Sequence, residues 1–204
     1  MTCAVGGGSS RSLAKAEAPG LSSAAMEKHH IRDVLISADD IRARVDRQVV
    51  EMRDACHADN LVMIGILRGS FIDLADLVRA LYHHGVHPRI DFITLESYGA
   101  GTESSGQVHV AKDFSMEVKD ADVILVDDIL DTGRTLDFAR RHVMAKGARS
   151  VKTCALLDKP SRRIVPFQAD FTGFTIEDAF VVGYGLDYDS RYRELPYIAK
   201  VTFV

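Results

Sequence analysis

Three aspartates and a glycine-containing turn lie in one short segment, at Asp127, Asp128, Asp131 and residues 132–135. Carboxylates this close repel one another, so they require partners such as ribose hydroxyls, a divalent cation or a protonated base. The turn combines amides, two threonine hydroxyls and a glycine that lets a ligand approach the backbone, which is the composition of a phosphate cradle. Carboxylates beside a phosphate cradle indicate a site for a phosphorylated sugar.

The turn also invites comparison with the P-loop of nucleoside triphosphatases. That motif needs a glycine five positions before its second glycine and a lysine directly after it. Asp128 and Arg134 occupy those positions, so the sequence excludes a P-loop. An acidic turn that caps a helix would explain any single aspartate, but it does not explain the whole pattern across 123–135.

Unbroken apolar runs predict the strands that position these residues. The runs at 61–67 and 123–126, together with the mostly apolar segment 151–157, are typical of strands buried on both faces of a sheet. Shorter strand patterns occupy 90–95 and 108–110. Ligands bind parallel sheets beyond the carboxyl ends of the strands, so the aspartates are predicted directly after the strand 123–126, at the ligand-binding edge.

Helical patterns alternate with these strands. Ser37 and Asp40 resemble a capping box, after which apolar residues recur every three or four positions across 41–56. Further helices are predicted at 71–81 and 134–146, each followed by a glycine that ends it. Strands alternating with helices predict right-handed crossovers and a parallel α/β sheet.

Composition limits the possible functions. The formal net charge of the 204 residues is −4, which lacks the basic surplus typical of nucleic-acid-binding proteins. No apolar run reaches the roughly 18–20 residues of a membrane span. Three widely spaced cysteines, Cys3, Cys56 and Cys154, fit neither a disulfide framework nor a zinc site. We therefore expect reduced thiols in a cytoplasmic protein that binds neither nucleic acid nor membrane.

The start of the chain differs from the rest. Residues 1–27 are mostly glycine, serine, alanine and polar groups, so we predict a disordered tail. A transit segment, or a natural start at Met26, is the alternative interpretation. Residues 28–204 are long enough to form one domain with a substantial core.

Four further motifs accompany segment 123–135. They are Leu67-Arg-Gly-Ser70, Leu95-Glu-Ser-Tyr-Gly99, Leu157-Asp-Lys-Pro160 and Phe180-Val-Val-Gly-Tyr-Gly-Leu-Asp-Tyr-Asp189. Segment 123–135 resembles the signature with which type I phosphoribosyltransferases bind phosphoribosyl pyrophosphate (PRPP), and the four motifs resemble the hypoxanthine, or hypoxanthine-guanine, branch of that family. The resemblance implies a single α/β domain with a central parallel sheet flanked by helices, and a small hood built from N- and C-terminal segments.

The resemblance implies how PRPP is bound. Asp127 and Asp128 would hold the ribose hydroxyls, although many relatives carry glutamate at the first position. Arg68, Gly69 and Arg193 would bind pyrophosphate. Relatives often have lysine at the position of Arg68, with a cis peptide bond directly before that residue. The residues implied for the 5′-phosphate are Asp131, Thr132, Gly133, Arg134 and Thr135.

The resemblance also implies a purine site. Lys159 would donate to the purine 6-oxo group, Phe180 would stack on the base, and the backbone of Val181 would read its edge. Asp131 would accept the proton at N7 as the catalytic base, since an ordinary aspartate is ionised at pH 7. Without the resemblance, a solvated lysine and a core phenylalanine are the plainer interpretations.

Mg²⁺ and a lid complete the implied site. Asp127, Asp128 and Asp187 would bind Mg²⁺, which neutralises the departing pyrophosphate, and Asp187 would also contact the purine. Ser97 and Tyr98 would form a lid that keeps water from the oxocarbenium-like transition state.

The function implied is purine salvage, in which hypoxanthine, and in this branch also guanine, reacts with PRPP in a homodimer or homotetramer. The alternative is a regulator of the same fold that senses PRPP or nucleotides and binds RNA or DNA. The negative charge and the presence of Lys159 and Asp187 favour the enzyme. An enzyme for xanthine, adenine or a pyrimidine is a third possibility, in which Lys159 disfavours adenine.

Overall fold

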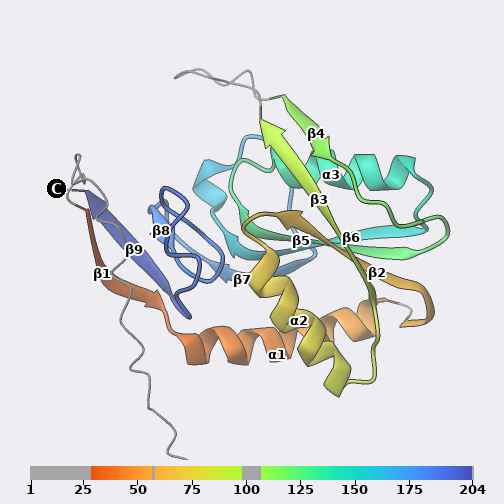
Figure 1. The fold of residues 1–204 in the computed structure, drawn as a ribbon, viewed down its shortest axis with the longest axis horizontal. Helices are drawn as coiled ribbons and strands as arrows, with labels where there is room; N and C mark the ends of the chain where they lie inside the picture. The colour runs from red at the N-terminus through yellow and green to blue at the C-terminus, as the bar shows by residue number, and fades with distance from the viewer. Residues whose placement is uncertain (1–28, 57, 98–106, 204) are drawn as a thin grey trace, which may run out of the picture.

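The computed structural model describes residues 29–56, 58–97 and 107–203, which form two sheets and three α-helices (Figure 1). The larger sheet has the strand order β4-β3-β2-β5-β6-β7. Its strands are β2 (Leu61–Leu67), β3 (Arg89–Ser97), β4 (Val108–Lys112), β5 (Asp122–Leu130), β6 (Ser150–Asp158) and β7 (Phe171–Thr175). Neighbouring strands are parallel except for β3 and β4 at one edge. The predicted parallel sheet is confirmed, with one antiparallel edge strand.

The helices cover both faces of this sheet. α1 (Ala38–Ala55) and α2 (Phe71–His83) pack on one face and α3 (Arg134–Ala145) on the other (Figure 1). Two single turns of 3-10 helix lie at Ala58–Asn60 and Pro160–Arg162. Among the described helices, none combines the length and the apolar character needed to span a bilayer.

The first helix forms as its sequence predicts. The hydroxyl of Ser37 accepts a hydrogen bond from the amide of Asp40 at 3.1 Å, which caps α1. The predicted apolar face of the helix is buried, at Ile41, Val45, Val49 and Met52. The local cap and the burial of one face both fix α1 against the sheet.

Strand β5 is longer than predicted. It ends at Leu130, so Asp127 and Asp128 lie within its last residues and only Asp131 follows it. The prediction that the strand ends at Val126 is wrong, because the backbone pairing with β6 continues to the end of β5. A central strand, not a loop, therefore fixes the first two carboxylates.

A second sheet joins the two ends of the described chain. β1 (His29–Ile36), β9 (Ile198–Phe203) and β8 (Val181–Val182) pair antiparallel in the order β1-β9-β8, to one side of the larger sheet (Figure 1). The predicted hood of N- and C-terminal segments is confirmed. The predicted tail, residues 1–27, lies outside the described residues.

One carboxyl group of α2 is fully buried. Asp73, in the first turn of α2, has no exposed surface, and neither of its carboxyl oxygens has a hydrogen-bond partner among the described residues. Burial, assisted by the nearby carboxylates of Asp76 and Asp128, raises the pKa of Asp73 from 3.8 to about 7. The sequence patterns do not predict a buried acid at this position.

Replacing Asp73 by asparagine is expected to stabilise the fold increasingly as pH rises. The folded chain keeps this proton up to about pH 7, whereas the ordinary pKa is 3.8. The buried carboxyl therefore destabilises the protein progressively between these values and fully above them. At about 1.4 kcal/mol per pKa unit, the full effect is about 4 kcal/mol before relaxation.

Urea unfolding at acidic and mildly alkaline pH measures this effect. Asp39→Asn, at an exposed position of α1, is the control and should show no such trend. A difference between Asp73→Asn and the unaltered protein that stays constant with pH would contradict the prediction.

Candidate active site

The carboxyl ends of β2 and β5 open into a cavity of about 390 Å³. Its lining comprises residues 66–69, Leu95, residues 127–133, Thr135, Leu136, Asp187 and Arg193. The cavity therefore brings together the two strand carboxylates, most of the predicted phosphate cradle and all three residues predicted to bind pyrophosphate.

The two carboxyl groups at the end of β5 lie close to one another, Asp127 in a buried position and Asp128 in a partly buried one. Asp127 is 6% exposed, and its Oδ1 accepts a hydrogen bond from the amide of Asp128 at 3.1 Å. Burial raises the pKa of both groups, and the neighbouring Asp128 carboxylate raises that of Asp127 further. Hydroxyl groups or a cation in the cavity would relieve this repulsion.

Gly69 lies directly against Asp128. A Cβ at residue 69 would overlap the Asp128 carboxylate, and a Cβ on Gly185 would overlap the carbonyl of Gly69. The peptide bond between Leu67 and Arg68 is cis, as the resemblance implies. β5, the turn after β2 and the C-terminal segment are therefore packed tightly at the edge of the cavity.

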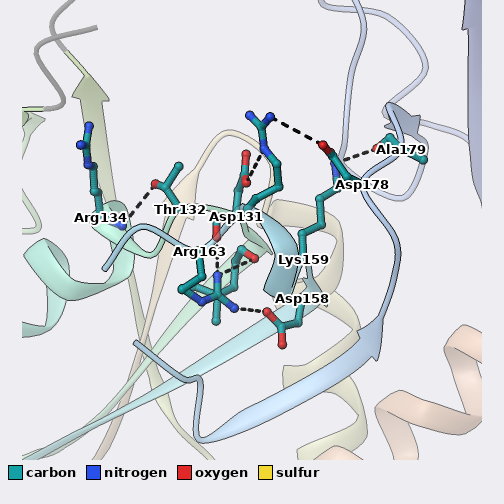
Figure 2. Close-up of polar contacts among 10 residues, drawn as sticks. Asp131, Thr132, Arg134, Asp158, Lys159, Arg163, Asp178 and Ala179 are labelled. Atoms are coloured by element: carbon teal, nitrogen blue, oxygen red, sulfur yellow. Dashed lines mark hydrogen bonds and ion pairs between the residues drawn. The ribbon is translucent and has the colours of Figure 1, made fainter. Parts of the chain in front are cut away.

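The turn after β5 leads directly into α3. Gly133 has a φ of 86°, which favours glycine, and the amide of Arg134 donates to the Thr132 hydroxyl at 3.4 Å. Thr132, Gly133 and Thr135 line the cavity, where the amides at the start of a helix can bind an anion. The Arg134 side chain is not in the lining, and its guanidinium points away from Asp131 (Figure 2).

The C-terminal segment contributes an ion pair to the cavity. Asp187 Oδ1 lies 2.7 Å from a guanidinium nitrogen of Arg193, and Asp187 Oδ2 accepts from the amide of Ser190 at 2.8 Å. Arg193 also donates to the carbonyl of Gly185. With Arg68 in the same lining, the cavity has two cationic side chains able to face a polyanion.

Lys159 lies beside this cavity and is not part of its lining. It follows β6 and is 8% exposed, and its amide donates to the carbonyl of Leu130 at 3.0 Å. Its ammonium group donates to the carbonyl of Ala179 at 2.7 Å (Figure 2). The contact with β5 places Lys159 next to the predicted catalytic aspartate.

Two of the other three residues predicted to bind a purine lie in strand β8 of the hood or directly before it. Phe180 is 46% exposed, and its ring meets that of Tyr188 edge-on at 5.6 Å between centroids. Val181 is buried in β8, where it pairs with Lys200 of β9. An exposed ring is available to stack on a planar base.

Residues 37–189, which hold β5, the phosphate cradle and Lys159, match the family model described as phosphoribosyl transferase domain. The hypoxanthine phosphoribosyltransferase of Haemophilus influenzae is 44% identical to this chain over 86% of the chain and 98% of its own length. The chain belongs to the hypoxanthine phosphoribosyltransferase family.

Two more members of the family support this assignment. The hypoxanthine-guanine phosphoribosyltransferase of Bacillus subtilis is 42% identical over 85% of this chain and 94% of its own length. The Trypanosoma cruzi hypoxanthine phosphoribosyl transferase, whose structure comes from work on its C-terminal region, oligomeric state and enzymatic activity, has a TM-score of 0.79 and 38% identity over 84% of this chain and 92% of its own. The predicted family and fold class are confirmed.

Arg163, which the sequence analysis did not predict as a site residue, holds the turn after β5 in place. Arg163 donates to the carbonyls of Leu130 and Asp131 and pairs with the carboxylate of Asp158 (Figure 2). It therefore fastens the turn after β5 to the end of β6. Its position shortly after Lys159, in a pair of arginines, is the signal that could have indicated it.

The other arginine of that pair spans the predicted purine site. Arg162 Nε lies 3.2 Å from Asp131 Oδ1, and its Nη1 lies 3.6 Å from Asp178 Oδ2. Asp178 Oδ1 is in turn 3.7 Å from the Lys159 ammonium. A chain of charges thus connects the predicted catalytic base with the predicted 6-oxo donor; Figure 2 labels Asp131, Asp178 and Lys159 of this chain.

The donors present are chemically suited to Mg²⁺. Within the described part of the chain, no three or more His, Cys, Asp or Glu side chains are placed to hold a metal ion by themselves; this includes the histidines at 83–87. Mg²⁺ commonly takes one or two protein carboxylates and completes its shell with water and substrate phosphates. The carboxylate pair Asp127 and Asp128 fits that mode, and the full set with Asp187 stays a prediction.

Two predictions fall partly outside the described residues. Ser97 ends β3, but Tyr98 is not described, so the lid of this phosphoribosyltransferase stays a prediction. Cys56 and Cys154 are free thiols, as predicted, whereas Cys3 is not described.

Proposed function

We propose that the protein is a purine salvage enzyme that transfers the phosphoribosyl group of PRPP to hypoxanthine, giving IMP and pyrophosphate, with guanine as the second base to test. The observation that supports this most directly is the single cavity that unites a carboxylate pair, a phosphate cradle and two arginines. Ribose, 5′-phosphate and pyrophosphate need these three features in turn. Relatives named as hypoxanthine phosphoribosyltransferases support the choice of base.

The cavity would bind PRPP through its three groups. Asp127 and Asp128 would accept hydrogen bonds from the ribose hydroxyls, and residues 131–135 would bind the 5′-phosphate through amides and hydroxyls. Arg68 and Arg193 would pair with pyrophosphate. Gly69, which lacks a side chain and therefore fits against Asp128, would offer its backbone to the same anion.

The reaction exchanges one bond at ribose C1 for another. The bond to the pyrophosphate oxygen breaks with its electron pair on the leaving group, and purine N9 forms the new bond to C1. The Asp131 carboxylate would accept the proton released at N7. Lys159, positioned by the Ala179 carbonyl, would donate to the 6-oxo group.

The remaining base contacts and the metal complete the proposal. Phe180 would stack on the purine, and Val181 and Asp187 would read its edge. Asp127, Asp128 and Asp187 would hold Mg²⁺, which neutralises charge on the departing pyrophosphate.

A panel of bases tests this function. Hypoxanthine, guanine, xanthine and adenine are each incubated with PRPP, with and without Mg²⁺, and the nucleotides are separated by chromatography. IMP is expected only when PRPP and Mg²⁺ are both present, and adenine is expected to give no product. If no 6-oxopurine yields a nucleotide, the proposal is wrong. A gel shift with structured RNA or DNA at moderate salt would favour the regulator instead.

We also infer a homodimer or homotetramer in the cytoplasm. The work on the Trypanosoma cruzi relative, which concerns oligomeric state together with activity, supports the assembly. Light scattering of the purified protein measures its mass in solution directly.

Lys159→Met is expected to raise the KM for hypoxanthine about tenfold or more, because a hydrogen bond from a charged donor contributes about 1.5–3 kcal/mol. The KM for PRPP should change little, since Lys159 does not line the PRPP cavity. Steady-state kinetics measure both constants, and Lys112→Met, at an exposed position of β4, is the control. An equal rise in both constants would instead indicate that the substitution has disturbed the whole site.

A further inference from the structure

The C-terminal segment 183–193 makes an unusual bend at Tyr184. Gly183, Tyr184 and Gly185 have φ values of 101°, 48° and 101°. The left-handed region suits glycine but disfavours other L-residues by about 1–2 kcal/mol. A tyrosine in this conformation needs surrounding contacts that keep it there.

The side chain of Tyr184 supplies such a contact. It is 6% exposed, and its hydroxyl donates to Oδ2 of Asp76, in α2, at 2.6 Å. Burial and the carboxylates of Asp73 and Asp76 raise the pKa of Tyr184, so the phenol keeps its proton and remains a donor. This hydrogen bond joins two parts of the chain that are far apart in sequence.

Both residues of this hydrogen bond lie in segments that also carry a residue proposed to bind pyrophosphate. Asp76 belongs to the helix that begins directly after the turn containing Arg68 and Gly69. Tyr184 precedes Gly185, whose backbone packs against the carbonyl of Gly69. The carbonyl of Gly185 in turn accepts a hydrogen bond from Arg193.

We propose that the Tyr184–Asp76 hydrogen bond is a positioning contact for PRPP. It holds the segment carrying Arg193 against the turn carrying Arg68, so that both cations face one pyrophosphate. Tyr184 does not line the cavity and acts through Gly185. The inference rests on the proposed function, because that function assigns the two arginines to pyrophosphate.

The purine side of the site is held by other contacts. Lys159 is fixed by the Ala179 carbonyl, and Val181 is fixed by its pairing with Lys200 of β9; these contacts lie outside segment 183–193. Loss of the Tyr184 hydroxyl should therefore weaken the binding of PRPP and leave the binding of the base unchanged.

Tyr184→Phe, which removes only the hydroxyl, is the principal test. The KM for PRPP, and its dissociation constant by calorimetry, are expected to rise about tenfold, which corresponds to the loss of one hydrogen bond to a charged group. The KM for hypoxanthine and the kcat at saturating PRPP should not change. Tyr82→Phe, which removes a phenol hydroxyl from the exposed face of the same helix, is the matched control.

Variants of the acceptor separate positioning from general damage. Asp76→Asn retains an oxygen acceptor and should stay close to the unaltered protein. Asp76→Ala also removes the exposed ion pair between Asp76 and Arg79, which contributes little, so it should reproduce the effect of Tyr184→Phe on PRPP. The double variant should bind PRPP no worse than either single variant, because both remove the Tyr184–Asp76 hydrogen bond. Thermal unfolding of every variant is measured alongside.

Two outcomes would overturn the inference. One is a lower melting temperature for Tyr184→Phe with an unchanged KM for PRPP, which would make the bond merely structural; the other is an equal rise in KM for both substrates. If the unaltered protein binds PRPP but forms no nucleotide, the proposed reaction fails, while calorimetry with PRPP alone still tests the positioning contact.

Discussion

Asparagine in place of Asp131 is expected to lower kcat at least about 100-fold, the contribution of a general base. The amide has the size of the carboxylate but cannot take up the proton that purine N7 releases. The dissociation constant for PRPP should change little, because amides and hydroxyls of Thr132, Gly133 and Thr135 remain in the cavity lining. Initial rates of IMP formation at saturating substrates, together with calorimetric titration of PRPP, measure the two quantities separately.

The control for this experiment comes from the adjoining helix. Asp137→Asn alters a carboxylate in the first turn of α3 that pairs with Arg141, and it should leave kcat unchanged. In Asp131→Asn, Arg162 keeps Asp178 as a partner, so the local structure should persist. An unchanged kcat would remove Asp131 from catalysis, and a parallel loss of PRPP binding would assign it to binding.

Gly69→Ala is expected to lower kcat/KM for PRPP about 100-fold or more, the scale on which a misplacement of about 1 Å acts. The new methyl group would overlap the Asp128 carboxylate. Asp128 cannot move aside easily, because β5 is held between β2 and β6. The turn after β2 must therefore shift and carry Arg68 with it. Steady-state kinetics with varied PRPP give the measurement.

Gly85→Ala separates this steric effect from the general loss of a glycine. Gly85 follows α2 with a φ of 72°, and a Cβ there would meet nothing within 4 Å. This control should lose about 1–2 kcal/mol of stability, the cost of an alanine in the left-handed region, and keep its affinity for PRPP. Normal PRPP kinetics in Gly69→Ala would show that the contact between Gly69 and Asp128 is not tight in solution.

Elements with one clear hydrophobic period were predictable from the sequence. The apolar run 61–67 coincides with β2, and the helical spacing after Ser37 coincides with the buried face of α1. In these segments one face, or both faces, of the element must be buried, and the spacing of apolar residues within the segment shows which faces these are.

Features that depend on contacts between distant segments were not predictable in this way. Residues 181–182 form a strand too short for any pattern, and they are defined only by pairing with β9. The buried Asp73 and the clamp made by Arg163 likewise arise where separate elements meet. A polar residue has no periodic signature that reports which distant partner it will contact.

The candidate site stands between these cases. The residues of the β5 motif were found by type and spacing, and the fold brings Asp127, Asp128 and the cradle to one cavity as expected. The end of β5 was misplaced because aspartates are poor strand formers, and pairing with β6 overrides that preference. The roles of Lys159 and Asp187 rest on the family resemblance and await the experiments above.

The pairing of β1 with β9 affects the order in which parts of the chain can fold during synthesis. Of the described strands, β1 is synthesised first and its partner β9 last. Contacts between such distant residues form late, because closing a long loop costs conformational entropy. As the chain leaves the ribosome, the carboxylate pair and cradle of β5 should therefore take shape while β1 is still unpaired. In a newly made molecule, the part of the site that β5 contributes would therefore form before the hood.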